Sequence, residues 1–273
     1  MLGAIIGDVV GSIYEVEEIK SKGTRTYEER IKILDRNTPL FREDSSYTDD
    51  TILTCAILDA IKNGNCDYEK YLREYGLNEV SIGLDKYGRS RFGKGFISRL
   101  NDTKQGNSYG NGSAMRISPV GYLFNDLETV KKESYKATIP SHNNEEAIKA
   151  AEAVSTSIFL LRNKSKEEVI KYIKNNYYDL DFNLEDLQRN YKFSSKASSS
   201  VPQALYVFSV SNDFEDAIRK AISIGGDSDT IACIVGSLAE ACYGIPESIK
   251  EEVKGYLNDN IINLLEGEKE WKK

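Results

Sequence analysis

The chain of 273 residues carries a formal charge of −7 and has a pI near 5.1. Its lysines and arginines are spread among aspartates and glutamates without forming a basic patch, which excludes nucleic acid as an expected partner. Residues 1–13 are apolar, but Asp8 interrupts them and no basic segment precedes them, so we expect neither a signal peptide nor a membrane span.

No segment is rich enough in proline, glycine or serine to form a long linker, so we expect one domain over residues 1–273. His142 is the one histidine, which excludes a multi-histidine zinc site and leaves oxygen ligands as the expected metal chemistry. The cysteines lack CxxC spacing and are typical of small core residues in a reducing compartment, so we expect a cytoplasmic protein. They are Cys55, Cys66, Cys233 and Cys242.

Helical periodicity dominates the chain and strand-like alternation is scarce, so the sequence predicts an all-α fold. Expected helices cover residues 2–10, 51–62, 147–161, 166–175, 203–208, 214–224, 230–243 and 246–265. In the first of them, Gly3, Gly7 and Gly11 lie four residues apart, which predicts close packing against another helix. Glu15 follows directly, either as a solvated helix end or as a general base, and the residues alone leave both open.

Glycines punctuate residues 83–112, a segment with little apolar content, as is typical of loops. At its end a glycine-rich turn leads into a short helix over residues 114–117, which Pro119 ends or kinks. Backbone N–H groups at such a turn suit a phosphate, although an Asn-Gly pair is more often only a turn. Residues 194–200 form a serine-rich loop, and we expect Pro202 to start the next helix.

Two acid clusters, far apart in the chain, each precede an apolar helical run; they are Thr48-Asp49-Asp50-Thr51 and Asp227-Ser228-Asp229-Thr230. Either cluster alone suits a helix N-terminus, where Asp and Thr oxygens accept hydrogen bonds from orphan amides. Capping does not need adjacent carboxylates at both places, and their mutual repulsion raises at least one pKa unless a cation neutralises it. Such a density of oxygen ligands suits Mg²⁺ or Mn²⁺.

Taken together and in this order, the motifs of the chain resemble those of the ADP-ribosylglycohydrolase family, from residue 2 to about residue 246. The matching segments are residues 3–11 with Glu15, 47–51, 108–116, 141–143, and 225–230 with Tyr243-Gly244. The resemblance implies an all-α, single-domain orthogonal helical bundle with two metal ions in a cleft. It also implies an enzyme that hydrolyses the bond joining ADP-ribose to its acceptor.

The resemblance further implies a metal site and a set of candidate bases. Two Mg²⁺ or Mn²⁺ ions are expected, with ligands from Thr48, Asp49, Asp50, Asp227, Asp229 and Thr230. Such ions fix the ribose hydroxyls and orient a water molecule for attack on the sugar. Glu15, Asp50 or Asp229 would accept the proton of that water, and the sequence does not rank the three.

The resemblance implies a substrate site as well. Its parts are Ser108, Gly110, Asn111 and Gly112 around the diphosphate and ribose, Tyr109 near the adenine, and Gly93 in the ribose pocket. His142 matches a pocket histidine, with a purely structural role as the alternative. Thr103 stands where some relatives carry an aromatic that sandwiches the adenine, so the second face of the base is open or is covered by Phe92 or Phe96.

Family members cleave arginine-linked, serine-linked or small-molecule ADP-ribose, and the sequence leaves the acceptor open. We expect a monomer that acts on an ADP-ribosylated protein or small molecule, releases ADP-ribose, and has no nucleic-acid or membrane partner. The alternatives are a catalytically silent ADP-ribose-binding relative, marked by a lost metal ligand, and a di-metal phosphohydrolase, marked by release of AMP. None of the implied metal ligands is missing from the sequence.

Overall fold

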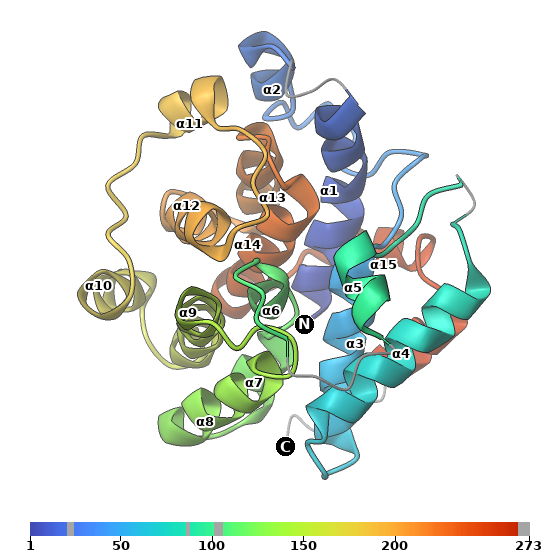
Figure 1. Ribbon diagram of the computed structural model, residues 1–273. Helices are drawn as coiled ribbons and strands as arrows, with labels where there is room; N and C mark the ends of the chain where they lie inside the picture. The colour runs from blue at the N-terminus through green and yellow to red at the C-terminus, as the bar shows by residue number, and fades with distance from the viewer. Residues whose placement is uncertain (21–24, 86–87, 101–105, 267–273) are drawn as a thin grey trace.

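The structure is a computed structural model that describes residues 1–20, 25–85, 88–100 and 106–266. These residues form sixteen α-helices joined by turns and loops (Figure 1). Within them there are isolated β-bridges between Asn107 and His142 and between Gly110 and Lys196, but no β-strand. The all-α class predicted from the sequence is therefore confirmed.

The helices of the N-terminal half are α1 (Leu2–Lys20), α2 (Tyr27–Lys32), α3 (Asp49–Lys62), α4 (Tyr68–Ile82), α5 (Lys94–Arg99), α6 (Gly112–Met115), α7 (Ser118–Leu123) and α8 (Leu127–Thr138). Those of the C-terminal half are α9 (Glu145–Leu161), α10 (Lys166–Asn176), α11 (Leu184–Asn190), α12 (Ala197–Ser209), α13 (Phe214–Ser223), α14 (Ser228–Tyr243), α15 (Glu247–Lys254) and α16 (Asp259–Glu266). The expected helices that became α3, α9, α10, α13 and α14 match to within two residues at each end.

The structure corrects the first expected helix, because α1 runs to Lys20 and not to residue 10. Ser12, Ile13 and Tyr14 are buried, so the packed face of the helix continues beyond the last glycine of the motif. Glu15 therefore lies inside α1 and does not follow its end.

The expected helix over residues 246–265 was also wrong, since it is divided into α15 and α16. Gly255 is the C-cap of α15, and Asn258 Oδ1 accepts a hydrogen bond from the backbone N–H of Ile261 (2.9 Å) in the first turn of α16. Pro246 is the N-cap of α15 and not part of its first turn. The apolar period continues from α15 into α16, but the caps at Gly255 and Asn258 divide the helix itself.

α12 begins at Ala197, ahead of the expected residue 203, and contains Pro202. Ala197, Ser200 and Val201 are fully buried, so the packing of this face outweighs the hydrogen bond that is lost at the proline nitrogen. The residues expected to form the end of a serine-rich loop are thus helical. Pro119 lies in the first turn of α7, and α6 has already ended at Met115.

Six helices were not predicted: α2, α4, α5, α7, α8 and α11. Side-chain caps begin all of them except α5 and α7, at Thr26, Asp67, Asp126 and Asn183, and each cap accepts a hydrogen bond from the N–H three residues later. These helices are short or strongly polar, so the cap was a better signal than the apolar period.

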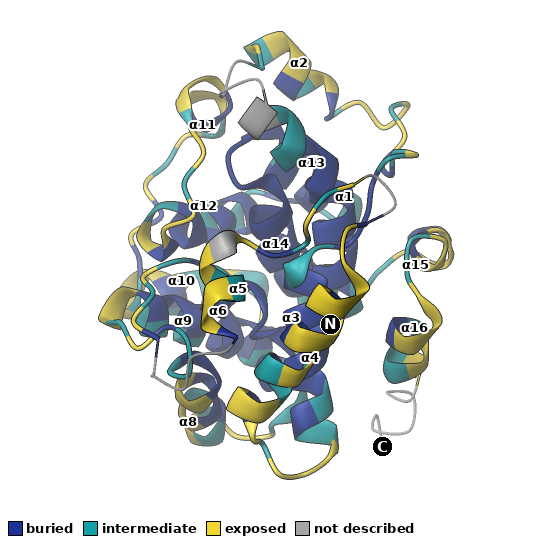
Figure 2. Cartoon of the chain, turned by 45° about the vertical axis from the view of Figure 1, so that its right-hand side comes forward, coloured by how far each residue is buried: buried dark blue, intermediate teal, exposed yellow. Residues whose placement is uncertain are grey.

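α1 packs along α14 in the centre of the molecule, and both helices are buried over most of their length (Figure 2). A Cβ atom on Gly7 would lie 1.9 Å from the carbonyl oxygen of Ala232 in α14. At Gly3 and Gly11 the corresponding distances to α14 carbonyl oxygens are 2.3 and 2.4 Å. The predicted close helix packing is therefore confirmed, and it brings Asp8 and Glu15 to the first turn of α14.

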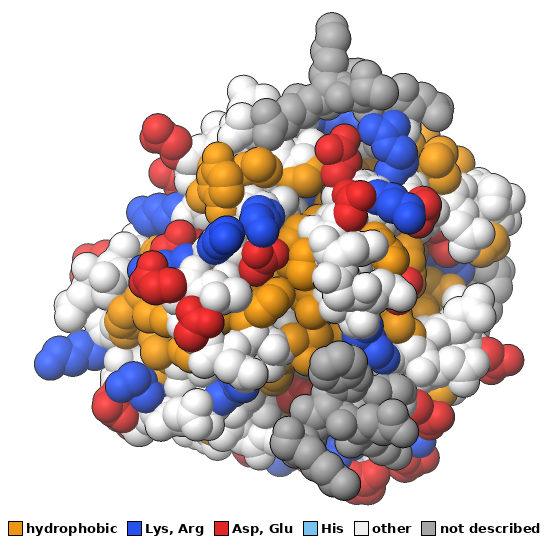
Figure 3. All heavy atoms as spheres, turned by 90° about the horizontal axis from the view of Figure 1, so that it is seen from below, with side chains coloured by type: hydrophobic (Ala, Val, Ile, Leu, Met, Phe, Trp, Pro, Cys, Tyr) orange, Lys and Arg blue, Asp and Glu red, His pale blue; other side chains and the backbone are white. Residues whose placement is uncertain are grey.

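On the face of the molecule seen from below, acidic and basic side chains are interspersed around apolar atoms (Figure 3). No helix among the described residues combines the length and the apolar character that a membrane span needs. All four cysteines are free thiols; Cys55 and Cys233 are buried as predicted, whereas Cys66 and Cys242 are only half-buried.

Candidate functional site

Both acid clusters begin helices, as predicted: Thr48 is the N-cap of α3 and Asp227 is the N-cap of α14. The Thr48 hydroxyl accepts a hydrogen bond from the N–H of Asp50 (3.3 Å), as an ordinary cap does. The Asp227 side chain makes no capping bond; its Oδ2 instead accepts a hydrogen bond from Asn111 Nδ2 (2.8 Å). Helix capping therefore does not explain the second cluster.

Asp8 of α1 belongs to the site, and sequence reasoning missed it as a site residue. It is fully buried, and its Oδ2 accepts hydrogen bonds from the N–H of Thr48 (2.9 Å) and from the N–H (3.1 Å) and hydroxyl (2.5 Å) of Thr51. Its Oδ1 accepts a hydrogen bond from the Thr48 hydroxyl (2.7 Å). The available signal was a single acid inside an otherwise apolar helix, which is costly without a partner.

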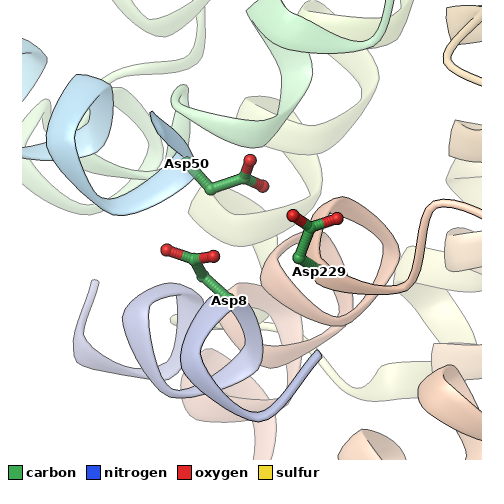
Figure 4. A group of neighbouring side chains, drawn as sticks. All are labelled: Asp8, Asp50 and Asp229. Carbon is green, nitrogen blue, oxygen red and sulfur yellow. The ribbon is translucent and has the colours of Figure 1, made fainter. Parts of the chain in front are cut away.

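Asp8, Asp50 and Asp229 come from α1, α3 and α14 and point toward one another (Figure 4). One carboxylate oxygen from each lies within 4.8 Å of the other two, and the same holds for Glu15, Asp227 and Asp229. Asp229 belongs to both groups. The two groups thus form one continuous acid cluster across three helices.

The donor set of this cluster fits divalent cations. Asp50 Oδ1 is buried and has no hydrogen-bond partner among the described residues, while Asp50 Oδ2 accepts a hydrogen bond from the Thr230 hydroxyl (3.3 Å). No lysine or arginine of the described chain forms an ion pair with Asp8, Asp50 or Asp229. Buried carboxylates without a cationic side chain are costly, and oxygen-only coordination by carboxylates is what Mg²⁺ and Mn²⁺ prefer.

The pKa values of the cluster agree with a site for divalent cations. Burial first, and then the neighbouring carboxylates, raises the pKa of Glu15 to about 9 and that of Asp49 to about 8. Burial and the charge of Glu15 raise the pKa of Asp227 to about 7. Burial raises the pKa values of Asp50 and Asp229 well above the ordinary range. Without cations, the cluster therefore holds protons at neutral pH.

A cavity of about 460 Å³ opens above the acids. Its wall contains every residue predicted to bind metal, together with Glu15, Gly93, Asn111 and Gly112. Ser108, Tyr109, Gly110 and His142 do not line this cavity; they lie in and behind the adjoining turn. Tyr109 is 59 % exposed, whereas His142 is buried. The structure thus gathers the predicted metal ligands closely and separates the predicted substrate residues into two parts.

The turn over residues 108–112 is held from both sides by backbone hydrogen bonds. Asn111 N–H donates to the carbonyl of Ser195 (2.9 Å), and Ala197 N–H donates to the carbonyl of Tyr109 (3.0 Å). On the other side, Ser108 N–H donates to the carbonyl of Ser141 (3.2 Å). This pairing places Asn111 where its side chain holds Asp227, and so it joins the turn to the acid cluster.

Other residues of the cavity wall were not found from the sequence. Arg89 Nε donates to Asp85 Oδ2 (2.8 Å), and Arg89 Nη2 donates to the Ser46 hydroxyl (2.7 Å). Phe193 also lines the cavity and is 42 % exposed. These residues lie in loops without periodicity, and no motif marks them.

The expected adenine contacts have mixed outcomes. Phe92 lines the cavity but is buried and stacks on Phe96, with ring centroids 4.7 Å apart. Thr103 lies outside the described residues. The contribution of Phe92 or Phe96 to adenine binding stays a prediction.

Residues 1–272 match the sequence profile of the family described as ADP-ribosylglycohydrolase. The chain belongs to this family. Among curated ADP-ribosylglycohydrolase-like proteins, it is 23 % identical to the ADP-ribosylhydrolase ARH3 of Homo sapiens, an alignment that covers 96 % of this chain and 90 % of the human protein. It is 26 % identical to the ADP-ribosylarginine hydrolase Tri1 of Pseudomonas putida, over 90 % of this chain and 70 % of that protein.

The fold is that of a solved member of the same group. A structure described as an ADP-ribosylglycohydrolase-related protein complex superposes with a TM-score of 0.68 at 19 % identity, and it covers 96 % of this chain and 93 % of its own. The family resemblance drawn from the separated motifs is therefore confirmed, and so is the fold.

Proposed function

We propose that this protein is a metal-dependent hydrolase that cleaves the glycosidic bond between ADP-ribose and its acceptor. The observation that carries the proposal is the convergence of buried carboxylates from α1, α3 and α14 beneath a cavity, with no cationic side chain of the described residues paired to Asp8, Asp50 or Asp229. Membership of the family and the activities for which the human and Pseudomonas relatives are named support it.

In this proposal two Mg²⁺ or Mn²⁺ ions are held by the predicted ligands and by one that the sequence reasoning missed. The predicted ligands are Thr48, Asp49, Asp50, Asp227, Asp229 and Thr230; the addition is Asp8. When bound, such ions supply Lewis acidity and lower the pKa of bound water. Asp50 supports the assignment most strongly, because its buried Oδ1 has no protein partner in the described chain.

The residues around the ligands hold them in position. Asp8 accepts hydrogen bonds from Thr48 and Thr51 and so fixes the first turn of α3 against α1. Asn111 donates to Asp227 and to the Ser200 hydroxyl (3.1 Å), which ties the substrate turn to the start of α14. Rigid placement of this kind lowers the cost of assembling the reacting groups.

Glu15 is the proposed general base. It is half-buried and lines the cavity beside Asp227 and Asp229, where its carboxylate can reach a water molecule. Glu15 takes one proton from the attacking water as the bond from C1″ to the acceptor breaks; the departing acceptor takes a proton from solvent, and Glu15 then releases its own proton to solvent. The net reaction adds water across the glycosidic bond. Asp50 and Asp229 are more deeply buried and serve better as ligands than as proton acceptors.

The substrate is proposed to lie along the 108–112 turn, with its ribose next to Asn111, Gly112 and Gly93 in the cavity wall. Tyr109, exposed on the turn, is available to stack on the adenine. The proposed substrate is an ADP-ribosylated protein or an ADP-ribosylated small molecule. The protein is proposed to act as a monomer in the cytoplasm.

Product analysis tests this function. Purified protein with Mg²⁺ is incubated with arginine-linked, serine-linked and small-molecule ADP-ribosyl substrates, and the products are separated by chromatography. We expect free ADP-ribose and the unmodified acceptor from at least one substrate. Release of AMP would identify a phosphohydrolase instead, and tight ADP-ribose binding without turnover on any substrate would identify a silent relative.

A further inference from the structure

A chain of hydrogen bonds connects two buried residues, Arg116 and His142, through the half-buried Ser141 behind the substrate turn. Arg116, at the end of α6, is fully buried, and its Nη2 donates to the carbonyl of Ala137 (3.2 Å) and to the hydroxyl of Ser141 (2.7 Å). Ser141 Oγ lies 2.7 Å from His142 Nδ1. The hydrogen bonds therefore run from the Arg116 guanidinium through the Ser141 hydroxyl to the His142 imidazole.

The direction of each bond follows from the chemistry of the donors. An arginine guanidinium has no acceptor, so Ser141 Oγ accepts from Arg116. Ser141 Oγ has no other hydrogen-bond partner among the described residues, which leaves His142 Nδ1 as the acceptor for its one hydroxyl proton. If Nδ1 carried the ring proton instead, the half-buried Ser141 hydroxyl would lose its acceptor within the described protein.

A neutral imidazole that accepts at Nδ1 carries its proton at Nε2. Burial, and then the charges of Arg116 and Arg99, hold the pKa of His142 well below its usual range, so the ring is neutral at pH 7. The Nε2 edge faces the substrate turn: a Cβ added to Gly112 would lie 3.1 Å from Nε2, and one added to Gly110 would lie 3.7 Å away.

We propose that Arg116 and Ser141 are positioning residues that fix His142 as the Nε2–H tautomer, which donates a hydrogen bond to a phosphate oxygen held on the 108–112 turn. This inference deepens, and rests on, the proposed function, because ADP-ribose supplies the phosphate. Glycine at positions 110 and 112 keeps the turn from covering the Nε2 edge. His142 then donates this hydrogen bond as a neutral imidazole, so the bond does not require a positive charge on the ring.

The tautomer is directly measurable because His142 is the single histidine of the chain. Protein without a polyhistidine tag is labelled with ¹⁵N-histidine, and the two ring nitrogens are assigned by NMR. We expect a pyridine-type shift for Nδ1 and a pyrrole-type shift for Nε2. The opposite tautomer, an imidazolium, or an even mixture would overturn the inference.

Variants of Ser141 and of Arg116 test the two positioning residues separately. Ser141→Ala should convert the ring to a mixture of tautomers, while Ser141→Thr, which restores the hydroxyl, should keep the Nε2–H form. An unchanged tautomer in Ser141→Ala would show that Ser141 does not fix the ring, and would overturn the inference. Because Arg116→Met removes a buried anchor and can fail to fold, Arg116→Lys serves as the matched variant that keeps a donor.

Calorimetric titration with ADP-ribose tests the donated bond. His142→Phe should weaken binding about tenfold, the size of one hydrogen bond to a charged acceptor, whereas His142→Gln, whose Nε2 reaches a similar position, should stay within about threefold of the parent. Equal losses in both variants would contradict the assigned donor. A protein with the expected tautomer and binding but no ADP-ribose release would contradict the proposed hydrolysis alone, and the opposite tautomer in an active enzyme would contradict the positioning chain alone.

Discussion

Asp50 and Asp8 are neighbours in the acid cluster with different surroundings. Asp8 accepts four hydrogen bonds from Thr48 and Thr51, so its charge is solvated by the protein. Asp50 is almost as deeply buried, yet its Oδ1 has no partner in the described chain. We therefore propose separable roles for the two carboxylates: Asp8 also supports the fold, and Asp50 chiefly binds the metal.

Asp50→Asn tests this distinction, because it removes the charge and keeps the shape. We expect hydrolysis with Mg²⁺ to fall by about a hundredfold or more, since a metal ligand is lost. In EDTA at pH 9 the melting temperature should rise, because a buried charge no longer has to form. Glu128→Gln, at an exposed position in α8, is the matched control and should change neither quantity. A large loss of stability in Asp50→Asn would assign Asp50 a structural role.

Glu15→Gln tests the proposed general base. We expect ADP-ribose affinity and metal binding to stay near the parent values while turnover falls by about a hundredfold, the usual range for a lost general base. Calorimetric titration and single-turnover release measure the two quantities. If Glu15 only stabilised α1, the melting temperature would fall and the turnover of each folded molecule would be unaltered.

The pH dependence of stability follows from the raised pKa values. Glu15, Asp49 and Asp227 have pKa values of about 9, 8 and 7 in the folded protein without cations. In the unfolded chain they titrate near pH 4, so between these values the folded state holds protons that the unfolded state has released. The stabilisation from these protons is complete below about pH 4 and is lost as pH rises toward 9.

Thermal melts in EDTA should therefore show a melting temperature that falls between pH 5 and pH 9. Saturating Mg²⁺ should remove most of this slope, because cations replace the protons and bind more tightly as pH rises. The control is the same series with Asp50→Asn, in which the slope in EDTA should be smaller. A melting temperature that rises with pH in EDTA would contradict a cluster of buried acids with raised pKa values.

At the scale of elements, the pairing of α1 with α14 positions the site. The sequence predicted this close packing from Gly3, Gly7 and Gly11, because small residues four apart lie on one helix face. It did not predict that Asp8 faces α14, since that depends on the rotation of one helix against another. The sequence analysis also ended α1 too early, at residue 10. No helix breaker follows Gly11, and buried residues such as Tyr14 continue the helix to Lys20.

Gly7→Ala tests this element directly. The added methyl group would lie 1.9 Å from the carbonyl oxygen of Ala232, so the helices must move apart. We expect the free energy of unfolding to fall by about 1–3 kcal/mol, the usual cost of overpacking, and Mn²⁺ affinity to fall with it because Asp8 moves away from Asp229. Gly95→Ala, at a position with open space, is the control and should be nearly neutral. Unchanged metal affinity in a destabilised Gly7→Ala would show that the close packing of α1 on α14 does not control the metal site.

At the scale of the whole molecule, the sequence revealed the parts of the site that combine a local motif with a helical period. Thr48 and Asp227 mark helix starts, and the apolar residues that follow locate the helices α3 and α14. The opposite wall, with Arg89 held by Asp85, comes from a loop whose course depends on tertiary contacts. Such residues carry no local pattern, so only the assembled fold reveals them.

We propose that the acid cluster binds two divalent cations on which ADP-ribose release depends. The most direct test titrates Mn²⁺ into EDTA-treated, desalted protein and measures bound metal by electron paramagnetic resonance, with ADP-ribose release measured in the same samples. We expect turnover to be absent without metal and to rise with occupancy to two Mn²⁺ per chain, and we expect Asp50→Asn to lose both Mn²⁺ binding and turnover. Full turnover in excess EDTA would contradict it.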